Sequence, residues 1–205
     1  MGAVVSLDGL LDQQRVWKGR PQALPQGLQP TGHAALDAAL PGGGWPAGAL
    51  TELLLAAEGC GELQLLWPSL ARLTQAGERV VLITPPFIPY PPAWQAAGVD
   101  LQWLAVVQAG PSEVLWAAEQ CLRSGSCGAV LCWPHKADDR ALRRLQVAAE
   151  SGQTLAFACR PQQAALNPSP AALRIAVDAL PAQWRVLKCR GGLAPATPIA
   201  CPGRG

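Results

Sequence analysis

Short runs of apolar residues alternate along the chain with longer segments in which apolar residues recur every three or four positions. The runs predict buried strands, and the periodic segments predict helices that pack one face on a core. The predicted strands are 50–55, 79–83, 101–107, 128–132 and 155–159. The predicted helices are 35–40, 61–77, 94–98, 112–124 and 138–152. This alternation predicts an α/β protein in which helices flank a mostly parallel sheet.

Proline interrupts the pattern in two places. Pro68 lies inside the predicted helix 61–77, where a proline costs about 3 kcal/mol. The helix therefore either kinks at Pro68 or loses its first turn and begins near that residue. The segment 84–92, TPPFIPYPP, contains too many prolines to form regular structure.

The two ends of the chain differ from its centre. Residues 173–177 and 184–190 alternate weakly and predict a hairpin at the sheet edge. Residues 1–29 predict a short helix beginning at Ser6 and then a linker rich in proline and glycine. We therefore expect a core of residues 30–192 between an N-terminal arm and a flexible tail, residues 193–205.

The predicted N-terminal helix is a candidate binding element. Leu7, Leu10 and Leu11 form one apolar stripe, and Trp17 extends its apolar side. A helix of about ten residues is marginally stable alone in water. We therefore expect these residues to dock on a partner or on a second copy of the chain.

Composition excludes several classes of protein. At 205 residues, half of them apolar, the chain is long enough for one domain with a real core. It has no apolar run of the length of a membrane span, and its N-terminus has acids where a signal peptide is basic, so we expect a cytoplasmic protein without membrane contact. Seven cysteines without a CxxC pair, and two histidines, predict reduced thiols and neither a metal site nor disulfides.

Charge is unevenly distributed along the chain. Residues 1–120 carry 5 basic and 10 acidic side chains, whereas residues 121–205 carry 11 basic and 4 acidic ones. Such asymmetry is typical of a molecule with one face for an acidic partner or nucleic acid, and also of an ordinary solvated surface. Charge does not decide between direct DNA binding and no DNA binding.

The loop between strand 50–55 and helix 61–77 has the position of a phosphate-binding loop. Such loops carry the sequence GxxxxGK[ST], in which backbone N–H groups and the lysine hold phosphates. Here Glu62 occupies the lysine position and Leu63 the hydroxyl position. The degenerate loop comprises Ala56, Gly59, Gly61, Glu62 and Leu63.

The order of motifs resembles the RecA ATPase core. The motifs TG-x(3)-LD-x-AL and GG-x-P-x-G precede the loop, and the resemblance runs over about residues 30–193. It implies a RecA-like, P-loop NTPase-type fold. In this family acidic residues follow the second strand and end the fourth, and those positions hold Pro86 and Trp133 here. The resemblance therefore implies a degenerate nucleotide site, no cofactor and no ATP hydrolysis.

The phrase WAAEQCLRSGSCGAVLCW is similar to bacterial ImuA, a family grouped with the SulA cell-division inhibitors. That resemblance implies a non-catalytic adaptor of SOS-induced mutagenic translesion DNA synthesis, associated with the nucleoid during DNA damage. Its implied partners are an ImuB-like Y-family protein, RecA and an error-prone polymerase subunit. The alternative is a SulA-like inhibitor of cell division that binds FtsZ.

Two groups of cations are further candidates for partner contacts. Arg140, Arg143 and Arg144 lie on the outer face of helix 138–152, where they are placed to contact phosphates. Lys188 and Arg190 lie in WRVLKCRGGLAP, which resembles the RecA segment whose paired lysines reach the ATP phosphates of a neighbouring subunit. A solvated sheet edge defended by cations is the alternative for this pair.

Overall fold

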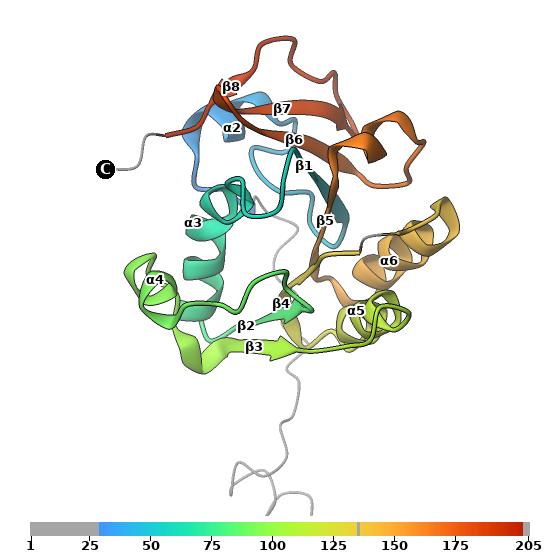
Figure 1. The fold of residues 1–205 in the computed structure, drawn as a ribbon. Helices are drawn as coiled ribbons and strands as arrows, with labels where there is room; N and C mark the ends of the chain where they lie inside the picture. The colour runs from blue at the N-terminus through green and yellow to red at the C-terminus, as the bar shows by residue number, and fades with distance from the viewer. Residues whose placement is uncertain (1–28, 135, 203–205) are drawn as a thin grey trace, which may run out of the picture.

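The computed structural model describes residues 29–134 and 136–202, which form one mixed sheet with helices on both faces (Figure 1). The strands are β1 (Leu50–Leu55), β2 (Arg79–Ile83), β3 (Leu104–Val107), β4 (Cys127–Cys132), β5 (Leu155–Pro161), β6 (Leu173–Ala179), β7 (Ala182–Cys189) and β8 (Ile199–Ala200). Their order across the sheet is β3-β2-β4-β5-β1-β6-β7-β8. The pairs from β3 to β6 are parallel, and β7 is antiparallel to both of its neighbours.

Helices cover the two faces of this sheet. They are α2 (Ala34–Ala39), α3 (Glu62–Gln75), α4 (Pro91–Ala96), α5 (Val114–Arg123) and α6 (Asp139–Gly152), with the 3-10 turns η1 (Leu101–Trp103) and η2 (Gln162–Leu166). Figure 1 shows α3 and α4 on one side of the sheet and α5 and α6 on the other. The predicted α/β sheet flanked by helices is therefore confirmed.

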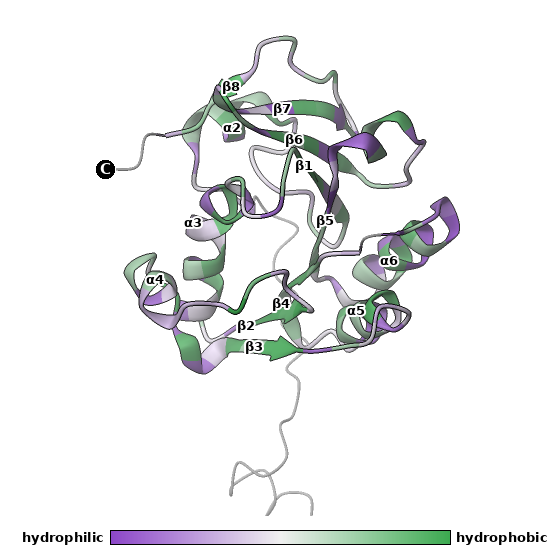
Figure 2. Ribbon diagram, viewed as in Figure 1, coloured by the Kyte–Doolittle hydropathy of each residue, from purple (hydrophilic) through white to green (hydrophobic). Residues whose placement is uncertain are grey.

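The strands are apolar on both faces because both faces are covered. On the α3 side, Leu53 and Phe157 pack with the inner face of α3, whereas Leu50 and Ala156 pack with α5 and α6. Figure 2 shows the central strands as hydrophobic and the outer faces of the helices as hydrophilic. Continuous apolar strands and one-sided helices are therefore what the packing requires.

Pro68 does not end or delay α3. The helix begins at Glu62 and continues through Pro68, so the predicted alternative in which its first turn is lost is wrong. The ring of Pro68 packs on Gly32, where a Cβ atom would lie only 2.2 Å from Pro68 Cβ. His33 Nε2 also donates to the carbonyl of Leu65 at 3.0 Å. The segment before α2 thus packs along α3 and supports the helix around its proline.

The C-terminal hairpin is longer than predicted and is extended by a further strand. Residues 173–179 pair with 182–189, and β8, from the segment predicted to be a flexible tail, pairs with β7. The Gln64 side chain donates to the carbonyl of Pro202 at 2.6 Å, which ties this segment to α3. Ile199 packs against the core cluster. A single apolar residue in a proline-rich tail is a weak signal for a strand, and the sequence alone therefore did not predict β8.

The predicted N-terminal helix, with Leu7, Leu10, Leu11 and Trp17, lies outside the described residues. None of the helices in the described part of the chain combines the length and the apolar content needed to cross a membrane.

Candidate functional site

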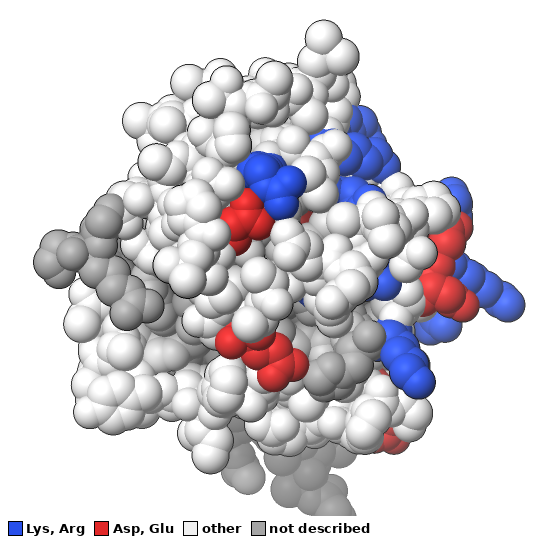
Figure 3. All heavy atoms as spheres, turned by 45° about the horizontal axis from the view of Figure 1, so that its top comes forward, with Lys and Arg blue, Asp and Glu red and all other residues white. Residues whose placement is uncertain are grey.

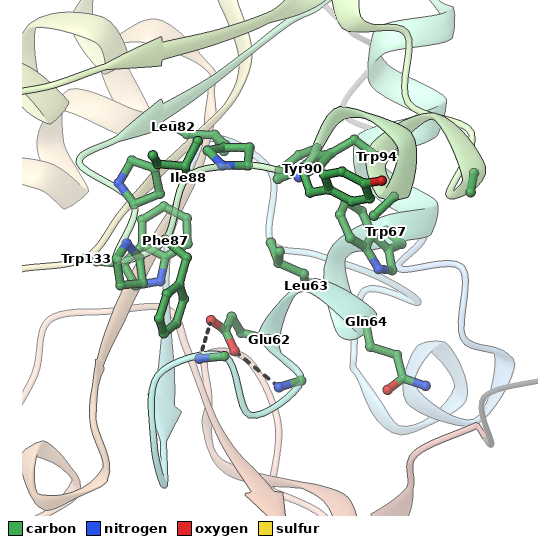
Figure 4. A pocket seen from close by; sticks show the side chains of 17 residues that line it. Glu62, Leu63, Gln64, Trp67, Leu82, Phe87, Ile88, Tyr90, Trp94 and Trp133 are labelled. Atoms are coloured by element: carbon green, nitrogen blue, oxygen red, sulfur yellow. Dashed lines mark hydrogen bonds between the residues drawn. The ribbon is translucent and has the colours of Figure 1, made fainter.

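The loop between β1 and α3 is filled by the side chain of Glu62. Gly59 and Gly61 have positive φ angles of 74° and 125°, which turn their N–H groups toward a common point. The N–H of Gly59 donates to Glu62 Oε1 at 3.1 Å, and the N–H of Gly61 donates to Glu62 Oε2 at 3.2 Å (Figure 4). Glu62 is 3% exposed, so this carboxylate is held inside the loop.

An internal carboxylate therefore occupies the place where such a loop holds a phosphate. The donors are backbone N–H groups beside the first turn of α3, which favour an anion there. Because Glu62 already supplies that anion, a phosphate would meet a negative charge and donors that are already paired. Glu62 thus satisfies the N–H groups of the loop from within the chain, and the described residues that line the pocket beside the loop include no Lys or Arg.

The two positions predicted to have lost acidic residues face the same space. Pro86 and Trp133 line one pocket together with Gly59, Gly61, Glu62 and Leu63. Trp133 is buried at the end of β4, and its indole Nε1–H has no hydrogen-bond partner among the described residues. Ala56, the first residue of the loop, does not line the pocket; its N–H donates to the carbonyl of Val177 at 3.4 Å. The structure thus brings the loop and both substituted positions together around an apolar cavity.

This pocket has a volume of about 840 Å³ and is walled mainly by aromatic and proline side chains. The rings of Trp67 and Trp94 meet edge to face, with 4.7 Å between their centroids. Figure 4 shows Trp67, Tyr90 and Trp94 on one side of the cavity and Phe87 and Trp133 on the other. A cavity of this size and lining is typical of a binding site for an apolar group.

Large apolar side chains at the pocket rim are exposed. In the β2–α4 loop, Phe87 is 62% exposed, Ile88 91% and Tyr90 68%. This loop lies against the glycine loop, because a Cβ atom on Gly59 would be 3.3 Å from the ring of Phe87. Exposed aromatic and aliphatic residues around an apolar cavity are typical of a protein-docking surface.

Charge is sparse on the side of the molecule that carries this surface. Figure 3 shows most Lys and Arg side chains toward the right of the view, which is the α6 side in Figure 1, whereas the α3–α4 side is largely uncharged. Sequence reasoning named Pro86, Trp133 and the glycine loop, which line the pocket, but it missed the exposed rim formed by residues 87–90. The available signal was three large apolar residues among prolines, in a segment that cannot bury them in a strand or helix.

A buried ion cluster lies on the opposite face of the sheet. Glu52 in β1 is fully buried and pairs with Arg160 of β5 at 2.5 Å and with Arg174 of β6 at 2.8 Å. Arg160 also donates to the carbonyl of Ala137, and Arg174 to that of Ala164, each at 2.7 Å. The cluster therefore anchors the segments that follow β4 and β5, and its carboxylate points away from the glycine loop.

The three arginines predicted to contact phosphates have different surroundings. Arg144 forms a close ion pair with Glu119 of α5, and Arg143 pairs with Asp139 at 3.2 Å. Arg140 is exposed. Phosphate contact by these arginines stays a prediction, and for Arg144 it would compete with a link between two helices.

Lys188 and Arg190 both contact the loop that precedes β6. Lys188 Nζ donates to the carbonyl of Ser169 at 2.7 Å, and Arg190 Nη2 donates to that of Pro170 at 3.4 Å. Burial, together with the neighbouring Arg190 and Arg174, lowers the pKa of Lys188. Contact of this pair with a partner stays a prediction, and any such contact would have to replace these bonds.

The cysteines of the described residues are free thiols, and no group of three or more metal-ligating side chains lies close together in that part of the chain. Burial raises the pKa of Cys132 to about 12 and also raises that of Cys159. Both thiols are therefore protonated at neutral pH and behave as core residues.

Comparison with known proteins gives one family match. A family model described as cell division inhibitor SulA matches residues 48–156, which are 109 of the 205 residues. Among solved structures, the crystal structure of SulA from Pseudomonas aeruginosa is 26% identical with a TM-score of 0.46, and the similarity covers 54% of this chain and 97% of that chain. A search of curated protein sequences found no match.

Proposed function

Because the chain belongs to the family of the cell division inhibitor SulA, we propose that it is a non-catalytic protein-binding component of the SOS response to DNA damage. The single observation that carries the proposal is the carboxylate of Glu62 inside the glycine loop. A loop closed by its own chain does not bind nucleotide, and the space beside it is an apolar pocket with an exposed apolar rim. Binding of another protein is the function that this geometry supports.

The fold is consistent with descent from a RecA-like, P-loop NTPase-type core. β1 lies inside the sheet, and the glycine loop connects its carboxyl end to α3, as in proteins that hold phosphates there. With Glu62, Pro86 and Trp133 at the catalytic places, we regard the chain as a degenerate ATPase that has kept a scaffold and lost its reaction.

The finer function that we favour is an adaptor of mutagenic translesion DNA synthesis. Its support is the similarity of residues 116–133 to ImuA and the extent of the chain beyond the family match. That match ends at Ala156, within β5, so β6, β7 and β8 lie outside it. An adaptor that joins an ImuB-like protein, a polymerase subunit and RecA needs more than one contact surface, and we assign the additional contacts to these extra elements.

The second candidate is a SulA-like inhibitor of cell division, which the family match favours directly. Such a protein would bind FtsZ and would need one docking surface. The two candidates differ in partner and agree on the apolar surface formed by the pocket and its rim, residues 87–90.

Purified proteins distinguish these candidates. We expect the chain to bind an ImuB-like protein from the same organism with micromolar or tighter affinity in calorimetry, and to leave the GTP-dependent assembly of FtsZ unchanged in a sedimentation assay. Inhibition of FtsZ assembly without ImuB-like binding would replace the adaptor with the division inhibitor. Binding to neither protein would contradict both.

The double substitution Ile88→Asp with Tyr90→Asp tests the docking surface itself. Interface anchors of this type contribute at least about 1.4 kcal/mol, so the double variant should bind the partner at least about tenfold more weakly. Leu180→Asp with Leu193→Asp is the control, because it adds the same charge at two exposed leucines, 95% and 94% exposed, that lie outside the pocket. Equal affinity of the double variant and the wild type would exclude this surface.

A further inference from the structure

The apolar pocket beside the glycine loop has a candidate occupant in the chain itself. The sequence alone predicts that residues 6–17 dock on a partner or on a second copy of the chain. We propose instead that they dock into this pocket of their own chain and cover its exposed rim when no partner is bound. The proposal rests on the chemistry of the pocket, on the residues of that segment, and on the place where the described chain begins. Only its consequence, competition with a partner, rests on the proposed function.

The pocket accepts an apolar group without charge. Both carboxylate oxygens of Glu62, the one charged residue in its lining, accept hydrogen bonds from the loop. Its walls are aromatic, aliphatic and proline side chains, and the rim residues Phe87, Ile88 and Tyr90 are more than half exposed. Covering this rim with an apolar side chain removes apolar surface from water, which stabilises the covered state.

Residues 6–17 supply side chains of the required kind. At 100° per residue, Leu7, Leu10, Leu11 and Trp17 fall on one side of a helix, and Asp8 and Asp12 fall on the other. The uncharged stripe can therefore meet the pocket while both aspartates remain in water. A helix of about twelve residues is about 18 Å long, which suits a surface formed by one side of α3 and the loop beside it.

The described chain begins close enough for this contact to form within one molecule. Gln29 is fixed beside the second half of α3, because Arg72 donates to its side-chain oxygen at 2.9 Å. Along α3, Arg72 is about 14 Å from Leu63, which lines the pocket. The eleven residues 18–28 reach about 36 Å when extended, more than twice that separation. An attached segment has a high effective concentration at such a site, which favours its own pocket over that of a second copy.

Docking of this segment would make the partner surface conditional. A partner that uses Phe87, Ile88 and Tyr90 would have to displace residues 6–17, so its apparent affinity would be lower than its affinity for the uncovered pocket. Removal of the apolar stripe should therefore strengthen partner binding, whereas removal of the rim should weaken it.

Hydrogen–deuterium exchange of the full chain tests the occupant without any partner. We expect the amides of residues 63–67 and 87–94 to exchange at least about fivefold faster in the double variant Leu10→Asp with Leu11→Asp than in the wild type. The matched control is Gly9→Asp with Val16→Asp, which adds the same charge on the side of the helix opposite the stripe and should exchange like the wild type.

Two outcomes would overturn the proposal. Exchange at residues 63–67 and 87–94 that is the same in the wild type and in Leu10→Asp with Leu11→Asp would show that residues 6–17 do not cover the pocket. Protection that disappears on dilution of the wild type would show that a second copy covers it. Failure of the partner assays described above would leave this exchange test valid, because it needs the chain alone.

Discussion

At the scale of single residues, the carboxylate of Glu62 occupies the place where a glycine loop of this kind would hold a phosphate. A lysine at its position would add a positive charge to the N–H groups of Gly59 and Gly61, and the glutamate instead supplies the anion that those groups bind. The sequence predicted that nucleotide binding was lost, because the position was acidic. It did not predict that the acid would turn back into the loop, which depends on the φ angles of two glycines.

The substitution Glu62→Ala should therefore restore an empty anion site. We expect no rise in melting temperature of the wild type with millimolar sulfate or Mg-ATP, and a rise with sulfate for Glu62→Ala, because the loop N–H groups lose their internal acceptor. Without added anion the variant should be less stable by about 2 kcal/mol, since hydrogen bonds to a charged group are lost. Differential scanning fluorimetry measures all three effects.

Glu113→Ala is the matched control for this prediction. Glu113 accepts a backbone N–H bond from Gly110 at 3.3 Å and is exposed, so its loss should not create sulfate dependence. Stabilisation of the wild type by Mg-ATP would contradict the closed-loop interpretation.

Glu52 is the second residue whose burial has a large energetic consequence. Its replacement by glutamine would leave Arg160 and Arg174 buried without a counter-charge, and breaking a buried pair in this way costs about 3–5 kcal/mol. Glu119→Gln should cost about 1 kcal/mol, because its partners Arg123 and Arg144 have side chains more than half exposed. Urea denaturation of the two variants should show this order, and equal losses would contradict it.

At the scale of elements, the β6–β7 hairpin is held at its turn by Asp178. Arg185 donates to this carboxylate at 2.7 Å and Gln183 at 3.1 Å. The hydrogen bond from Arg185 is the main reason that the pKa of Asp178 is lowered. The hairpin end should therefore be more stable when Asp178 is ionised.

Stability at this hairpin should depend on pH in one direction. A lowered folded pKa contributes stability that is present above the unfolded pKa of about 3.9 and is lost as pH falls through the folded value. Asp178→Asn should therefore lower the melting temperature at pH 7, and the difference from the wild type should shrink below pH 4. The control Asp139→Asn, in an exposed pair on α6, should change little at either pH. A difference that grows in acid would contradict this interpretation.

Elements were predictable where one local signal determined them. The apolar runs of β1, β2, β4 and β5 gave their positions because both sheet faces are buried, and the periodic segments gave α3 and α6. The course of α3 through Pro68 was not predictable from local sequence, since it depends on Gly32 and His33, which pack against it from elsewhere in the chain. Helix propensity depends on neighbouring residues in the sequence, so it does not predict a helix that is supported by contacts from another part of the chain.

The pocket was missed for a related reason. Its walls come from α3, α4, the end of β4 and the β2–α4 loop, which meet only when the parallel strands align their carboxyl ends. The proline-rich loop showed in the sequence only that regular structure was excluded. The exposed side chains of Phe87, Ile88 and Tyr90 indicate a docking surface only once the structure shows the cavity beside them.

At the scale of the whole molecule, the family match and the sheet do not coincide. The match covers β1 to the first residues of β5, whereas one continuous sheet extends to β8. β6 pairs along β1 and supplies Arg174 to the buried cluster, so the C-terminal strands are part of the core. The C-terminal strands therefore form part of the core sheet, and β8 forms one edge of that sheet.

Removal of β8 should expose a strand edge. β7 has eight residues, and β8 covers its N-terminal end by pairing Gln183 with Ala200 and Trp184 with Ile199. Deletion of residues 196–205 would remove this pairing, the packing of Ile199 on the core and the bond from Gln64 to Pro202. Unpaired strand edges promote pairing between molecules. We therefore expect the truncated protein to melt at a lower temperature and, in sedimentation velocity, to associate at concentrations where the full chain does not.

Deletion of residues 203–205 alone is the control and should change neither property, because Pro202 and β8 remain. Unchanged association of the protein that lacks residues 196–205 would show that Lys188, Arg190 and the cations beside them protect the edge of β7 without β8.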